Sequence, residues 1–165
     1  MTPAFLRASL EGDRIRASRE IGLELPGDWP ETPAILAYRL HQLEKDPDLQ
    51  PWLLRAMALR ETGEMAGHIG FHTAPDAEYI QEWQPGAVEF GFTVFPPYRR
   101  RGFAREASLA MMQWATSHHG VESFILTIAP ENTASQALAA DLGFKRIGIH
   151  VDDEDGDEDV LLLTV

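Results

Sequence analysis

The fold is decided by residues 87–104, AVEFGFTVFPPYRRRGFA. In residues 87–95, apolar side chains alternate with polar or small ones, which predicts a strand with one apolar face. Two prolines end this strand, and apolar residues then recur at helical spacing from Phe103 to a helix end at Gly120. A strand, a glycine-bearing loop and a helix predict a crossover unit, in which the next strand, residues 124–128, runs parallel to the first.

Hairpins on both sides of this unit extend the predicted sheet. Residues 53–60 and 65–72 read as two strands joined by a short turn with glycine. Residues 144–151 and 160–165 read as a final hairpin across an acidic loop. Because hairpins are antiparallel and the crossover unit is parallel, we expect a mixed, mostly antiparallel, twisted central sheet.

Helices complete the predicted architecture. Residues 132–142 predict a second helix in the C-terminal half, ended by a glycine, and residues 1–46 read as mostly helical. We therefore predict the α/β (α+β) class, with a sheet core over residues 53–165 that is flanked by helices. A length of 165 residues favours one domain spanning the whole chain, residues 1–165.

The composition excludes several classes of function. The formal net charge of −12 argues against a nucleic acid partner, because binding to phosphate backbones requires a basic face. The absence of cysteine excludes disulfides, a thiolate nucleophile and thiolate metal ligands. No apolar run approaches the length of about 18 residues that a membrane span requires. We therefore expect a cytoplasmic protein with no metal and no membrane partner.

The charges are distributed unevenly along the chain. Residues 152–159, DDEDGDED, hold seven of the 26 acidic residues, whereas residues 99–105 hold four of the 14 lysines and arginines. The basic cluster lies where a loop opens a helix, and backbone N–H groups there lack intrahelical partners. Gly102 would let this loop approach an anion closely, and Ala104 would keep the first helical turn uncrowded. The pattern fits either a phosphate or pyrophosphate cradle or a basic helix start with solvated side chains.

Two common nucleotide cradles are absent from the sequence. Neither G-x-x-x-x-G-K-[ST] nor G-x-G-x-x-G occurs, so neither a P-loop nor a Rossmann fingerprint is present. Residues 94–104, VFPPYRRRGFA, instead resemble the acetyl-CoA motif of the GNAT superfamily of N-acetyltransferases, V-x-P followed by [RQ]-x-x-G-x-[GA]. Arg99, Gly102 and Ala104 occupy its three defining positions.

A second signature of the same superfamily follows at the expected distance. Residues 129–144, APENTASQALAADLGF, are similar to the segment in which an asparagine, here Asn132, opens a short helix that ends in Leu-Gly-Phe. The N-x-x-S form and the E-F-G-F-T before the loop are most similar to the branch of ribosomal-protein N-terminal acetyltransferases. The resemblance covers residues 53–165 and implies a GNAT-like fold.

The resemblance also implies direct acetyl transfer from acetyl-CoA to an amine in a ternary complex. The strands at residues 87–95 and 123–129 would splay apart around the pantetheine arm, which Asn132 would position. The pyrophosphate would lie on backbone N–H groups of residues 100–105, and an N–H near Val94 would polarise the thioester carbonyl. The residues so implied in cofactor binding are Thr93, Val94, Arg99, Arg100, Arg101, Gly102, Phe103, Ala104, Arg105 and Asn132.

Two residues are candidates for proton transfer. A lysine-like amine has a pKa of about 10.4, so it must lose a proton before it attacks, and Glu89 is the candidate base. The alternative for Glu89 is an exposed strand residue or the partner of a nearby arginine. Many family members protonate the leaving thiolate with a tyrosine at the position of Ala139. Ser135 is the nearest substitute here, and its alternative role is hydrogen bonding on the helix surface.

Some functional questions stay open at this point. A non-catalytic acyl-CoA-binding module and an unrelated nucleotide-binding domain are the alternatives to the acetyltransferase. The acceptor is an amine of a small molecule or of a peptide or protein N-terminus, and the protein is expected to be a monomer or a homodimer. His68 and His72 are interpreted as packing or substrate-side residues. The acidic residues 152–159 either attract a cationic acceptor or form a solvated turn.

Overall fold

The computed structural model describes residues 1–75, 77–152 and 156–165, which form two compact units. One unit consists of residues 1–70 and 92–103, and the other of residues 71–91 and 104–165. The strands form a six-stranded sheet in the order β1-β2-β3-β4-β6-β5. The pairs β1–β2, β4–β6 and β5–β6 are antiparallel and β3–β4 is parallel, which confirms the mixed, mostly antiparallel sheet.

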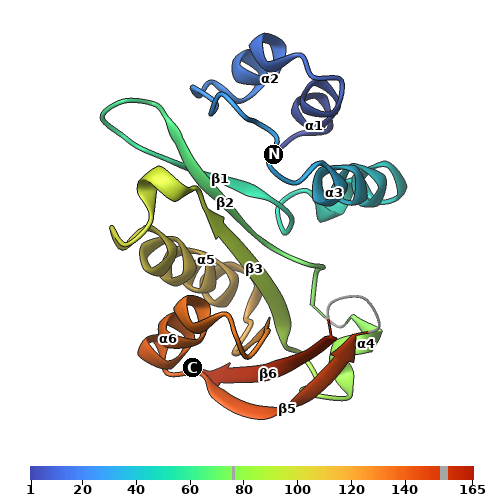
Figure 1. Ribbon diagram of the computed structural model, residues 1–165. Coiled ribbons are helices and arrows are strands. Elements are labelled where there is room, and N and C mark those ends of the chain that lie inside the picture. The colour runs from blue at the N-terminus through green and yellow to red at the C-terminus, as the bar shows by residue number, and fades with distance from the viewer. Residues whose placement is uncertain (76, 153–155) are drawn as a thin grey trace. The chain divides into compact units, whose positions relative to one another are not determined.

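Three helices open the first unit (Figure 1). They are α1 (Pro3–Leu10), α2 (Arg14–Ile21) and α3 (Pro33–Lys45), which confirms the mostly helical start. The side chain of Asp13 caps α2 by accepting a hydrogen bond from the N–H of Arg16. Thr32 precedes α3, and its side chain makes no capping hydrogen bond.

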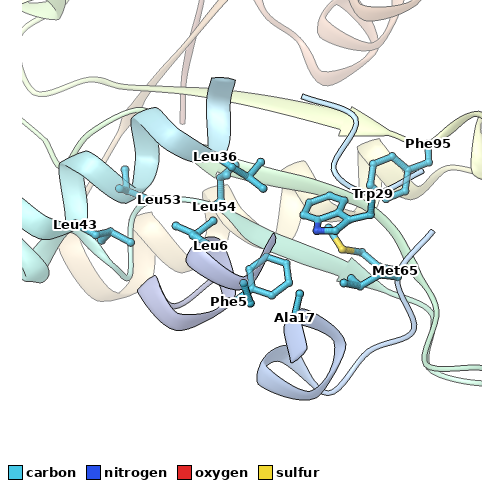
Figure 2. Close-up of a cluster of buried hydrophobic side chains, with 12 residues drawn as sticks. Phe5, Leu6, Ala17, Trp29, Leu36, Leu43, Leu53, Leu54, Met65 and Phe95 are labelled. Atoms are coloured by element: carbon cyan, nitrogen blue, oxygen red, sulfur yellow. The ribbon is translucent and has the colours of Figure 1, made fainter. Parts of the chain in front are cut away.

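The helices of the first unit cover an apolar core that extends to the start of the sheet. After the 3₁₀ turn η1 (Pro47–Leu49) come β1 (Arg55–Ala58) and β2 (Met65–Phe71). Figure 2 shows Phe5 and Leu6 of α1, Leu36 of α3 and Met65 of β2 in one buried cluster with Trp29. The Trp29 indole N–H donates to the Ser9 hydroxyl over 2.9 Å, so its polar group is satisfied inside the core.

The second unit contains the predicted crossover. Its elements are α4 (Glu78–Gln81), the first part of β3 (Val88–Val94), α5 (Phe103–His119), β4 (Ser123–Ile128), α6 (Thr133–Leu142), β5 (Lys145–Asp152) and β6 (Gly156–Thr164). Gly143 ends α6 in the left-handed conformation, φ 93°, as predicted. The short helix α4 lies between β2 and β3 in the sequence, and its Ile80 side chain is buried.

The two terminal strands extend further into the acidic segment than the sequence predicted. Asp157 pairs with Val151 and Asp159 with Ile149, so the last acidic residues belong to β6. Asp159 is held there by Arg146 and by Gln136, which explains why acidic residues continue the strand. Asp153, Glu154 and Asp155 lie outside the described residues.

Aromatic side chains pack around the first residues of β3 in the second unit. The ring of Phe71 stacks on Phe124 at 6.4 Å and meets Phe90 edge-on at 6.1 Å. Val88 pairs with Phe124, and Glu89 pairs with Ile125, where β3 and β4 run parallel. Glu89 is therefore an acidic residue between two buried apolar neighbours on the same strand.

Candidate functional site

The basic loop changes direction through two residues with positive φ. After the 3₁₀ turn η2 (Pro96–Tyr98), Arg99 is extended, Arg100 has a φ of 59° and Gly102 has a φ of 84°. Positive φ is unfavourable for a residue with a side chain, and such conformations cluster where backbone amides must converge on a ligand. Since α5 begins at Phe103, the loop ends at the positive end of a helix dipole.

Three of the four arginine side chains in residues 99–105 have partners. Arg99 Nε donates to the Val94 carbonyl over 2.9 Å, and the Arg101 guanidinium lies 5.1 Å from the centre of the Phe103 ring. Arg105 on α5 pairs with Asp141 on α6 over 2.8 Å, although more than half of each side chain is exposed. An anion at this segment would therefore be bound mainly by backbone N–H groups, with the guanidinium groups supplying surrounding positive charge.

The end of β3 approaches its neighbour unusually closely within the first unit. A Cβ atom built on Gly67 of β2 would lie 2.2 Å from the Thr93 carbonyl oxygen and 3.0 Å from Val94 Cα. Only glycine fits at this position, because real Cβ contacts are not that short. Gly67 therefore fixes the backbone at Thr93 and Val94, the stretch that the sequence assigned to cofactor binding.

The second signature forms a capped helix. The Asn132 side chain accepts a hydrogen bond from the N–H of Ser135 over 3.2 Å and so caps α6, in agreement with the predicted helix start. Ser135 lies in the first turn and is partly buried, while Ala139, one turn later, is fully buried. The structure thus places the Asn132 side chain against the backbone N–H of Ser135.

The Asn132 cap gives a prediction for stability. Asn132→Ala should lower the free energy of unfolding by about 1 kcal/mol, because the N–H of Ser135 loses its acceptor. Asn132→Ser, whose hydroxyl can also cap a helix, should lose clearly less. Thermal unfolding of the two variants checks this, and equal losses in both would show that the cap contributes nothing.

Glu89 is buried and surrounded by hydrogen-bond donors. Tyr79 Oη donates to Glu89 Oε2 over 2.9 Å, and Thr127 Oγ1 donates to Oε1. His72 Nδ1 lies 3.2 Å from Oε2. Burial taken alone raises the pKa of the Glu89 carboxyl, but these donors, above all His72, lower it to about 2. The predicted alternative, an exposed strand residue or an arginine partner, is therefore wrong.

The sequence did not identify the residues around Glu89 as a cluster. His72 follows the end of β2, Tyr79 lies in α4 and Thr127 in β4, so three separate segments converge on the carboxylate. In the sequence, the signal for this cluster was a polar residue near the end of each neighbouring strand, His72 after β2 and Thr127 in β4. His68 is a different case, because it is buried between the rings of Trp29 and Phe95, and burial lowers its pKa to about 4. His68 therefore has the packing role that the sequence suggested.

Among residues 1–75, 77–152 and 156–165, no group of three or more His, Cys, Asp or Glu side chains is arranged to hold a metal ion. Within the same ranges, no helix is both long and apolar enough to span a bilayer.

Known proteins share this sequence pattern and fold. The sequence model of the Acetyltransferase (GNAT) domain family matches residues 13–145. An uncharacterized N-acetyltransferase of Bacillus subtilis, YjdG, is 28% identical over 131 residues, which are 78% of this chain and 74% of that protein. Aminoglycoside N(6')-acetyltransferase type 1 of Salmonella typhimurium is 34% identical over 80 residues, which are 47% of this chain and 54% of that protein.

A solved structure is similar in fold. A proposed acetyltransferase from Salmonella typhimurium, solved with its cofactor acetyl-CoA, superposes with a TM-score of 0.59 at 19% identity. The match covers 78% of this chain and 73% of that one. This similarity confirms the predicted fold.

Proposed function

Because the chain belongs to the GNAT acetyltransferase family, we propose that it transfers an acetyl group from acetyl-CoA to an amine. The acceptor is an amine of a small molecule or of a peptide or protein N-terminus, and it attacks the thioester directly in a ternary complex. The observation that carries this proposal is the loop before α5, where positive φ at Arg100 and Gly102 precedes a helix start. The relative solved with acetyl-CoA supports the choice of cosubstrate.

The cofactor would be held mainly by the backbone. The N–H groups of Arg100, Arg101, Gly102, Phe103, Ala104 and Arg105 are proposed to bind the pyrophosphate, with Arg99 nearby in the same loop. The strand end at Thr93 and Val94, fixed by Gly67, is proposed to bind pantetheine, and the Val94 N–H to polarise the carbonyl that is attacked. These assignments follow from free N–H groups at a helix start and from the family motif.

The second signature would act on the pantetheine side. Asn132 is proposed to position the arm, and Ser135 to donate a proton to the departing thiolate. The buried Ala139 offers no donor at the position where many family members carry a tyrosine. That absence of a donor side chain is the observation that favours the second candidate, a non-catalytic acyl-CoA-binding module.

The net charge supports a cationic acceptor. A protein with a net charge of −12 attracts cationic amines, and one relative is named for acetylating aminoglycosides. We therefore propose a panel of spermidine, kanamycin and a short peptide with a free N-terminus. The reaction is proposed to occur in the cytoplasm, where its cosubstrate is a metabolite. The oligomeric state, a monomer or a homodimer, stays a prediction that sedimentation velocity checks.

The proposal is tested by binding and product analysis together. Calorimetry should show that acetyl-CoA binds and that ATP and NAD do not compete with it. Mass spectrometry should then detect an acetylated amine in at least one member of the panel. Binding without any acetylated product would favour the non-catalytic module, whereas preference for ATP or NAD would contradict both candidates.

A further inference from the structure

The strand β5 carries exposed apolar side chains at one edge of the sheet. In the described ranges, β5 stands last in the strand order β1-β2-β3-β4-β6-β5, and β6 is its single neighbour (Figure 1). Ile147 is 42% exposed, Ile149 is 47% exposed and Val151 is 69% exposed. An edge strand presents unpaired N–H and C=O groups along its outer side, and exposed aliphatic side chains on such a strand favour pairing with a further strand. β5 is therefore a candidate surface for strand addition.

The apolar side chains of β5 lie on the face of the sheet opposite Trp83. A Cβ atom added to Gly148 would lie 2.3 Å from a carbon of the Trp83 ring, so the indole covers β5 at this residue. Because successive side chains of a strand point to opposite faces, those of Ile149 and Val151 point away from Trp83. The exposed apolar positions thus share one uncovered face of the edge strand.

The sequence of β5, KRIGIHVD, is self-complementary in an antiparallel pair. When Ile149 stands opposite Ile149 of a second copy, Ile147 stands opposite Val151, so each exposed apolar position meets another. Pairs of this kind on one face stabilise antiparallel strands. The register of β5 with β6 is regular from Gly148 to the end of the strand, so this part can also pair on its outer side.

The charges of the segment favour the same arrangement. Lys145 and Arg146 make the start of β5 basic, whereas the sequence is acidic from residue 152 to residue 159. In an antiparallel pair, the basic start of each copy lies beside the acidic end of the other. In a parallel pair, like charges would meet, which is unfavourable. A second copy of this chain therefore matches the edge in both apolar pattern and charge.

We propose that the protein forms a homodimer in which the β5 strands of two copies pair antiparallel, centred on Ile149. Both copies use the same surface, so the contact closes at two copies and does not propagate into a fibre. The pairing satisfies the outer N–H and C=O groups of β5 and removes part of its apolar surface from water. This dimer does not depend on the proposed acetyl transfer.

Sedimentation velocity over a range of concentrations tests the dimer. Ile149→Lys would place two lysines against each other at the centre of the interface, so the dissociation constant should increase about 10²-fold or more. Within one copy, the new lysine lies opposite Asp159 of β6, so the variant should keep its fold, which circular dichroism checks. Ile15→Lys, at an exposed residue of α2, is the matched control and should dimerise as the parent does.

Cross-linking tests the register of the two strands. The chain has no cysteine, so a single cysteine variant reports on one position. With a short bis-maleimide, Ile149→Cys should form a covalent dimer, because the two thiols would face each other across the dimer axis. Ile147→Cys and Val151→Cys should cross-link efficiently when mixed and weakly when alone. Ile15→Cys is the control and should give no covalent dimer.

Three results would overturn the proposed dimer. The first is a parent protein that sediments as a monomer at every concentration. The second is a dimer whose dissociation constant is the same in Ile149→Lys as in the parent. The third is a dimer in which Ile149→Cys cross-links no better than Ile15→Cys, since the β5 strands would then not meet.

Discussion

Glu89→Gln is expected to lower kcat for an alkylamine acceptor by about 10²–10⁴-fold while leaving the affinity for acetyl-CoA nearly unchanged. Glutamine has the same shape, but its amide cannot accept a proton from the acceptor amine, the role that the sequence predicts for Glu89. Its amide also replaces one acceptor oxygen by an NH2 group, which would face one of the two hydroxyls, of Tyr79 or Thr127, that donate to the carboxylate in the parent. Steady-state kinetics and calorimetry together measure the two quantities.

Two controls separate this loss of kcat from a nonspecific effect of the substitution. Glu122→Gln changes an exposed carboxylate and should leave kcat at the parent value. In the double variant with His72→Gln, the two losses should not add, because His72 Nδ1 lies 3.2 Å from Glu89 Oε2 and residues in contact are not additive. Additive losses would mean that Glu89 acts independently of His72.

Glu89 should also contribute to stability in a pH-dependent manner. Its pKa is lowered from 4.5 to about 2 on folding, so the charged form stabilises the fold at pH values above 4.5. That contribution is lost as the pH falls from 4.5 through about 2. Glu89→Gln should therefore unfold more easily than the parent near neutral pH, and the difference should shrink toward pH 2. Thermal melts across this range measure it, and a difference that does not change with pH would contradict the assigned pKa.

Gly102→Glu is expected to weaken acetyl-CoA binding on the order of 10²-fold, because a carboxylate would lie beside the proposed pyrophosphate site. The residue has a φ of 84°, so any side chain there strains the backbone. Gly102→Gln carries the same strain without the charge and isolates the electrostatic part. Calorimetry should therefore show a much weaker affinity for the glutamate variant than for the glutamine variant. Equal affinities would remove the anion site from this loop.

Much of the fold could be predicted because it depends on residues that are close together in the sequence. The strand within residues 87–95, the glycine that ends α6 and the start of α6 at Asn132 each depend on residues a few positions apart, and each was confirmed. The start of β6 was predicted too late, because acidic residues are poor strand formers on their own. What holds Asp159 in that strand is its contact with Arg146 and Gln136, which no local pattern shows.

The candidate site was predictable only in part, because it also depends on contacts between segments that are distant in the sequence. Glu89 and the basic loop stand out in the sequence, whereas the convergence of His72, Tyr79 and Thr127 on one carboxylate depends on how separate segments pack. Gly67 was not identified either, since its importance lies in what a Cβ atom added there would meet. That residues 1–165 form a single domain stays a prediction.

The most direct test of acetyl transfer is the rate of thiol release from acetyl-CoA as the amine concentration increases. We predict that the parent protein releases thiol at a rate that rises with the amine and saturates, one thiol for each acetylated amine. A rate that does not depend on the amine, and equals the slow hydrolysis of acetyl-CoA in its absence, would contradict the proposed function.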